Sequence, residues 1–205
     1  MCTLLLAKAP VDLQDSSGRT ALYEACAEGH VEIARRLLAG KASVNLQCSS
    51  GSTALHAAAS VGHESVVRTL LDHADVQVDL QDDKGMAALH HACRSGHLVF
   101  VWALLARAAV DLQDNKGVSA LHVACRYGHA KVVRVLLSHK ATVDLQTKLG
   151  SSPLCVACMH RHAEVGEGPA ERQAAGQCFL CVVFKFLQRP AECTSNVIFR
   201  TIYSL

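Results

Sequence analysis

The sequence predicts an all-α solenoid of stacked helix-turn-helix units. Three observations lead to this fold class: a segment recurs at a near-constant spacing, apolar residues within each copy follow helical periodicity, and a glycine separates the two apolar stripes of each strong copy. A single unit of this kind cannot bury its apolar face alone. Neighbouring copies are therefore expected to stack and share one continuous core.

The repeat is visible in five segments that align without gaps. They start at Gly18, Gly51, Gly85, Gly117 and Gly150, so successive copies are 33, 34, 32 and 33 residues apart. The strong copies read GRTALYEACAEGH, GSTALHAAASVGH, GMAALHHACRSGH and GVSALHVACRYGH, and the fifth, GSSPLCVACMHRH, is weaker. Each strong copy continues into an aliphatic run with paired leucines and closes on Asn-Leu-Gln or Asp-Leu-Gln.

Within a copy, two short antiparallel helices are expected. In the fourth copy the first stripe comprises Ala120, Leu121, Ala124 and Cys125, and the second comprises Val132, Val133, Leu136 and Leu137. Gly128 lies between them, where the chain must reverse and a positive φ costs glycine little. Its equivalents are Gly29, Gly62 and Gly96.

This period divides the chain into units. Residues 1–14 are interpreted as the C-terminal half of a truncated repeat, residues 15–47, 48–81, 82–113 and 114–146 as full repeats, residues 147–165 as a degenerate partial repeat, and residues 166–205 as a divergent tail. The half repeat at the start favours a fragment or isoform of a longer array. In the tail, either residues 166 to about 181 are an insertion before a second helix near residues 182–191, or the tail is unrelated to the repeat.

Composition narrows the function classes. The formal net charge is +2 and charged residues make up 19% of the chain, which indicates neither a nucleic-acid nor a membrane partner chosen by bulk charge. No stretch reads as a signal peptide or a membrane span, so we expect a cytoplasmic or nuclear protein. The ten cysteines are then expected as reduced thiols that pack as small apolar residues.

The helix-opening motifs resemble those of the ankyrin repeat. The Thr-Pro-Leu-His motif of that family appears as Thr53-Ala54-Leu55-His56, Ala87-Ala88-Leu89-His90 and Ser119-Ala120-Leu121-His122 over a match of roughly residues 15 to 165. Alanine replaces proline in four copies, Tyr23 and Cys155 occupy the histidine slot, and Arg161 replaces the fifth hinge glycine. The resemblance implies a β-hairpin finger at each junction and a partner held by fingers and the exposed face of the first helices.

The expected function is therefore that of a scaffold or adaptor without catalysis or cofactor, which binds one protein partner of unknown identity as a monomer. Slots that packing does not fix are free to vary, so binding residues are sought there. The candidate partner-binding residues are Arg19, Lys84, Met86, Arg94, Lys116, Val118, Arg126 and Tyr127. The alternative is that the chain is the recognition fragment of a larger signalling or ubiquitin-ligase assembly.

A third function class is a zinc-binding protein. Cys155 and Cys158, followed by Cys178 and Cys181, have the spacing of a four-cysteine zinc site. The repeat already accounts for Cys158, which shares its slot with cysteines of three other copies, so packing is the favoured explanation. Neighbouring histidines and cysteines such as His90 and Cys93 recur in several copies, which argues against a single catalytic pair.

Asn45 is a candidate modification site. It is the one asparagine in a slot that Asp12, Asp79, Asp111 and Asp144 hold in the other copies. The resemblance implies that such an asparagine can be a target of an oxygen-dependent asparaginyl hydroxylase. The alternative is that Asn45 hydrogen-bonds its own turn.

Overall fold

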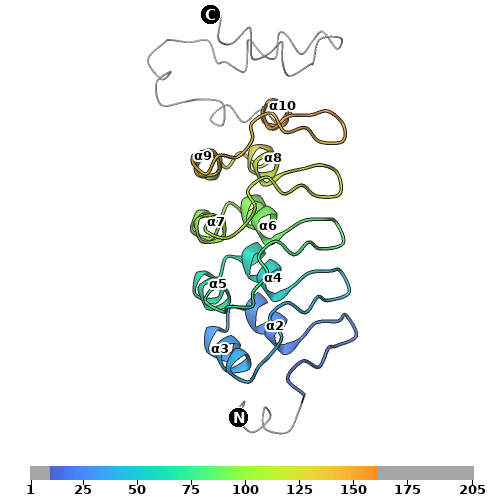
Figure 1. Ribbon diagram of the computed structural model, residues 1–205, viewed down its shortest axis with the longest axis vertical. Helices are drawn as coiled ribbons and strands as arrows, with labels where there is room; N and C mark the ends of the chain where they lie inside the picture. Colours follow the sequence, from blue (N-terminus) through green and yellow to red (C-terminus); the bar gives the residue numbers. More distant parts are fainter. Residues whose placement is uncertain (1–9, 161–205) are drawn as a thin grey trace, which may run out of the picture.

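The computed structural model describes residues 10–160, which form an elongated stack of helix pairs (Figure 1). In chain order the helices are α2 (Ala21–Ala27), α3 (Val31–Ala39), α4 (Ala54–Val61), α5 (Glu64–Leu71), α6 (Ala88–Ser95), α7 (Leu98–Leu105), α8 (Ala120–Arg126), α9 (Ala130–Ser138) and α10 (Pro153–Met159). The predicted all-α solenoid is confirmed.

The helices form two columns. We call α2, α4, α6, α8 and α10 the inner column and α3, α5, α7 and α9 the outer column; each helix packs against the next one in its own column and, from α2 to α9, against its pair partner (Figure 1). Copies that follow one another in sequence are therefore neighbours in space. An elongated surface built from equivalent positions of successive copies follows directly from this arrangement.

The hinge glycines adopt the backbone conformation that the sequence predicts. Gly29, Gly62, Gly96 and Gly128 have φ values of 78°, 103°, 74° and 72°. Three of them also touch the next repeat closely, since a Cβ on Gly96, for example, would lie 2.6 Å from the imidazole of His129. Glycine is thus required there both by the turn and by the stacking of copies.

Small aliphatic side chains fill the core. The first leucine of each pair is nearly inaccessible: Leu37 is 5% exposed, and Leu70, Leu104 and Leu136 are 0% exposed. Cys26, Cys93, Cys125 and Cys158, from four copies, are 0–3% exposed in one equivalent slot of the inner column. The cysteines therefore pack as small apolar residues, as predicted.

At each junction a loop projects beside the inner column (Figure 1). We call these loops fingers; they comprise residues 15–19, 48–52, 82–86, 114–118 and 147–151. Each is closed by a hairpin-type bond from its first residue to the carbonyl of its fifth, as from the Asp82 N–H to the Met86 oxygen at 3.0 Å. In the described chain only isolated bridges, Gln14 with Thr20 and Gln113 with Ser119, represent β-structure, because the arms are too short for regular strands.

Adjacent fingers are tied together through their backbones. The Asp83 N–H donates to the Ser50 oxygen, the Asn115 N–H to the Lys84 oxygen, and the Lys148 N–H to the Lys116 oxygen, at 2.9–3.1 Å. The glutamine that ends each repeat reinforces this row. Gln81, for example, donates from Nε2 to the carbonyls of Gly85 and Gln113. The fingers therefore form one continuous row on the inner side.

Candidate functional site

Three buried histidines join the inner column to the fingers. In His56, His90 and His122 the Nδ1 atom accepts a hydrogen bond from the backbone N–H three residues earlier, at 3.1–3.2 Å. The Nε2 atom donates to a carbonyl of the next finger, as from His90 to the Val118 oxygen at 3.1 Å. These rings are fixed as neutral Nε2–H tautomers, because one nitrogen accepts while the other donates.

Burial disfavours the charged form of these histidines. It lowers the pKa of His56 to about 4 and also lowers the pKa values of His90 and His122. The same cause raises the pKa of Cys26 and Cys125 to about 12, so these buried thiols are poor nucleophiles at neutral pH. The histidines and cysteines of the repeat therefore serve packing and positioning.

The residues that precede each hinge form the exposed part of the inner column. Arg94 and Arg126 lie in the last turns of α6 and α8 and are exposed, and Tyr127 is 42% exposed. The guanidinium carbon of Arg94 lies 5.8 Å from the centroid of the Tyr127 ring, within the range of a cation–π interaction. The structure thus brings together three predicted residues from two neighbouring repeats.

The finger residues divide into exposed and half-buried positions. Lys84 and Lys116 are exposed at equivalent positions in successive fingers. Met86 and Val118 are half-buried; their carbonyls accept from His56 and His90, and Val118 also packs against the core. The two lysines are exposed, whereas the two apolar residues present only part of their surface.

Arg19 lies in a different environment. Its guanidinium pairs with Asp15 at 3.0 Å and with Glu24 at 2.8 Å. In the first finger this arginine joins two carboxylates of its own repeat. The predicted partner-binding residues therefore do not form one uniform surface, because Arg19 lies in the first finger, before α2, whereas Tyr127 lies at the end of α8, three repeats further along the stack (Figure 1).

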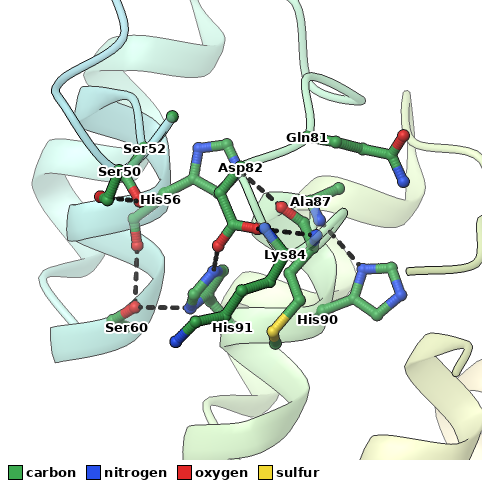
Figure 2. A network of polar contacts seen from close by, with 12 residues as sticks. Ser50, Ser52, His56, Ser60, Gln81, Asp82, Lys84, Ala87, His90 and His91 are labelled. Carbon is green, nitrogen blue, oxygen red and sulfur yellow. Dashed lines mark hydrogen bonds and ion pairs between the residues drawn. The ribbon is translucent and has the colours of Figure 1, made fainter. Parts of the chain in front are cut away.

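Sequence reasoning missed a polar network between the second and third repeats (Figure 2). His91 lies 3.2 Å from the Ser60 hydroxyl through Nδ1 and 3.1 Å from the Asp82 carboxylate through Nε2. The other carboxylate oxygen of Asp82 accepts from the N–H groups of Lys84 and Met86, both at 2.9 Å. The additional histidine beside His90 was the one clue in the sequence.

The order Ser60, His91, Asp82 resembles the constellation of a nucleophilic hydrolase, but the hydroxyl is used differently. Ser60 donates to the carbonyl of His56 in its own helix at 3.0 Å, as exposed helical serines commonly do. Burial also lowers the pKa of His91, although the nearby Asp82 raises it. The network fixes the third finger against α4 and α6.

Asn45 is half-buried and bonded on both sides of its amide. Its Nδ2 atom donates to the Asp75 carbonyl at 2.7 Å, and its Oδ1 accepts from the Gln77 N–H at 2.9 Å. The aspartates in the equivalent slot bond the following repeat in the same way, as Asp79 does with the Ala109 N–H. The amide of Asn45 thus bonds the following repeat rather than its own turn, and hydroxylation of Asn45 stays a prediction.

The predicted zinc ligands lie partly outside the described residues. Cys155 is half-buried and Cys158 is 1% exposed in the inner column, whereas Cys178 and Cys181 fall in the segment 161–205. Between residues 10 and 160, no group of three or more histidine, cysteine or acidic side chains is arranged to hold a metal ion. The slot that Cys158 occupies is the packing slot of the repeat.

The outer column carries a shallow groove between α5 and α7. It has a volume of about 520 Å³ and is lined by apolar residues such as Val67, Leu71 and Phe100. Trp102 borders it with 51% of its surface exposed, and its ring lies edge-on to His139 with 4.9 Å between centroids. Trp102 is the sole tryptophan of the chain.

Stacked copies with repeating buried slots and differing exposed slots define a solenoid of the recognition-scaffold class. The sequence model of one family, described as ankyrin repeats (3 copies), matches residues 1–82, 36–116, 74–147 and 89–167. The chain belongs to the ankyrin-repeat family. Ankyrin repeats are generally protein–protein interaction modules, and proteins built from them are typically non-catalytic.

No curated protein matches the chain. Among the described helices, none is long and apolar enough to cross a membrane.

Proposed function

We propose that this chain is a scaffold or adaptor that binds a partner protein through its fingers and the exposed face of the inner column, without catalysis. The observation that supports this most directly is the contrast between neighbouring slots. The residue three positions before each hinge is always Cys or Ala and is 0–3% exposed. The next residue is Ala27 in the first copy, Ser60 in the second, and arginine in the third and fourth, as Arg94 and Arg126, so three residue types occupy this slot.

Arginine and tyrosine are favoured as binding anchors because they combine a large contact area with a polar tip. Arg94, Arg126 and Tyr127 provide this combination on two adjacent repeats, and the cation–π contact orders Arg94 and Tyr127 before any partner arrives. Lys84 and Lys116 extend the same surface onto the fingers. We place the centre of binding on the third and fourth repeats.

The test is capture of partners from cell extract by three proteins: the wild-type chain, an inner variant and an outer variant. The inner variant carries Arg94→Ala, Arg126→Ala and Tyr127→Ala. The outer variant carries Lys131→Ala, Arg134→Ala and Trp102→Ala, which remove two exposed cations and one exposed aromatic residue from the outer column. Circular dichroism first establishes that all three fold.

A partner retained by the outer variant and lost from the inner variant is the expected result. Loss from the outer variant alone would move the binding site to the groove beside Trp102. Equal retention by all three proteins would contradict the proposed binding site on the inner column.

We also propose that the protein acts as a monomer in the cytoplasm or nucleus. Six described cysteines are free thiols, as a reducing compartment favours. Light scattering of the purified chain tests the first point, and imaging of a tagged chain in cells tests the second.

A further inference from the structure

The two halves of the described solenoid carry opposite charge. Residues 10–81 contain nine acidic and five basic side chains, whereas residues 82–148 contain five acidic and nine basic side chains, counting Asp and Glu against Lys and Arg. The total charge of the chain conceals this division. Because successive repeats stack along one axis, the charges are separated in space into an acidic half and a basic half (Figure 1).

The last three fingers expose three ammonium groups and one carboxylate, that of Asp83. Lys84, Lys116 and Lys148 are exposed, one in each of the last three fingers, and among the described residues their ammonium groups form no ion pair with a carboxylate within 4 Å. The aspartates that begin two of these fingers are used internally. Asp82 accepts from two N–H groups of its finger, and Asp114 does the same at 2.8 Å.

The first finger shows the opposite arrangement. Its one cation, Arg19, is paired with Asp15 and with Glu24 of α2. Glu28 is exposed at the C-terminal end of α2. A negatively charged ligand therefore meets attraction at one end of the finger row and repulsion at the other. This charge difference along the finger row determines where an acidic ligand binds and in which direction it lies along the row.

Exposed apolar residues occur on the same repeats as the lysines. Leu149 at the tip of the fifth finger is 93% exposed, Met159 at the end of α10 is 61% exposed, and the Tyr127 ring is 42% exposed. Single exposed apolar residues are ordinary, but here they lie on the same repeats as the lysine row. The surface therefore combines positive charge with anchoring sites for apolar side chains.

We propose that the partner presents an acidic protein segment with interspersed apolar residues, and that this segment lies across the last three fingers, over Lys84, Lys116 and Lys148. This inference rests on the proposed function and specifies the class of partner. A nucleic acid fits less well, because single strands are held by several stacking aromatic rings and Tyr127 is the one exposed aromatic side chain of the described inner face.

The experiment measures fluorescence anisotropy of a labelled 14-residue peptide of Glu, Asp and Leu with the full chain at low and physiological salt. A second peptide carries Gln and Asn in place of Glu and Asp. The finger variant is Lys84→Glu with Lys116→Glu, and the matched control is Lys131→Glu with Arg134→Glu in α9 of the same half. Both variants change the net charge equally, so they separate local recognition from bulk attraction.

We expect the acidic peptide to bind the wild-type chain at least tenfold more tightly than the neutral peptide. We expect the finger variant to lose at least tenfold in affinity and the control at most threefold, with weaker binding as salt rises. Equal losses in both variants, equal binding of the two peptides, or no binding of the acidic peptide would overturn the inference. Tighter binding of a labelled single-stranded oligonucleotide, lost in the same finger variant, would reassign the surface to nucleic acid.

Failure of this inference is distinguishable from failure of the proposed function. If the inner variant loses a captured partner while no acidic segment of that partner binds the chain, the scaffold function stands and only the class of partner is wrong.

Discussion

Two adjacent positions at the end of each inner-column helix differ in how strictly their residue type is kept from copy to copy. Cys93 and Cys125 are 0% and 3% exposed and occupy a slot that holds only Cys or Ala in the other described copies. The residues directly after them, Arg94 and Arg126, are exposed and have no counterpart in the first two repeats. One position along the chain thus separates residues that hold the stack together from residues free to specify a partner.

The largest expected effect on the free energy of unfolding distinguishes the two residues of one leucine pair. Leu136 is 0% exposed and its neighbour Leu137 is 41% exposed. Leu136→Ala leaves a cavity between helices, so we expect it to lower the free energy of unfolding by about 2–5 kcal/mol, and Leu137→Ala by less than about 1 kcal/mol. Urea denaturation followed by circular dichroism measures both, and similar losses would contradict the assigned packing.

The buried histidines make the stack sensitive to acid. Above pH 7, His56 is neutral in both the folded and the unfolded chain, so the stack keeps its full stability. Below its usual value of 6.5 the unfolded chain binds the proton first, since burial lowers the pKa of His56 to about 4 in the folded state. The free energy of unfolding should fall by roughly 3 kcal/mol between pH 7 and pH 4 from this residue alone.

Measurements at pH 7.5, 6.0 and 5.0 separate this effect from carboxylate protonation, which begins at lower pH. His56→Gln should reduce the pH dependence in that window, and the remaining slope should come from His90 and His122, whose pKa values burial also lowers. An unchanged slope in the variant would show that His56 is not responsible.

Removing one of the three histidines that join the inner column to the fingers should also destabilise the stack. His90→Ala leaves the Ala87 N–H and the Val118 carbonyl without their partner, so we expect a loss of about 2 kcal/mol. His30, at the start of α3, is exposed and makes no capping bond, so His30→Ala is the matched control with an effect near zero. A comparable loss in the control would show that the hydrogen bonds of His90 are not the source of the stabilisation.

Two finger glycines separate backbone strain from contact between repeats. Gly85 and Gly150 have φ values of 77° and 75°, so alanine costs about 1–2 kcal/mol at either position. A Cβ on Gly85 would lie 2.5 Å from the Asn115 nitrogen, whereas a Cβ on Gly150 meets nothing within 4 Å. Gly85→Ala should therefore destabilise the chain more than Gly150→Ala, as thermal unfolding of the two variants would show. Equal shifts would mean that the fingers are not in contact.

Most of the architecture was predictable because the period fixes the register. Once Gly96 was aligned with the other hinges, its positive φ, the burial of Cys93 and the exposure of Arg94 all followed. Contacts between copies were not predictable, since His91, Ser60 and Asp82 meet only when α4, α6 and the third finger pack together. The ion pairs of Arg19 and the inward packing of Val118 depend on neighbouring side chains in the same way.

Hydrogen–deuterium exchange of the chain with and without the captured partner tests most directly whether the partner binds the fingers and the inner column. We expect slower exchange in residues 82–86 and 114–118 and at the ends of α6 and α8, with no change in α7 and α9. Protection confined to the outer column or to the first finger would contradict this expectation.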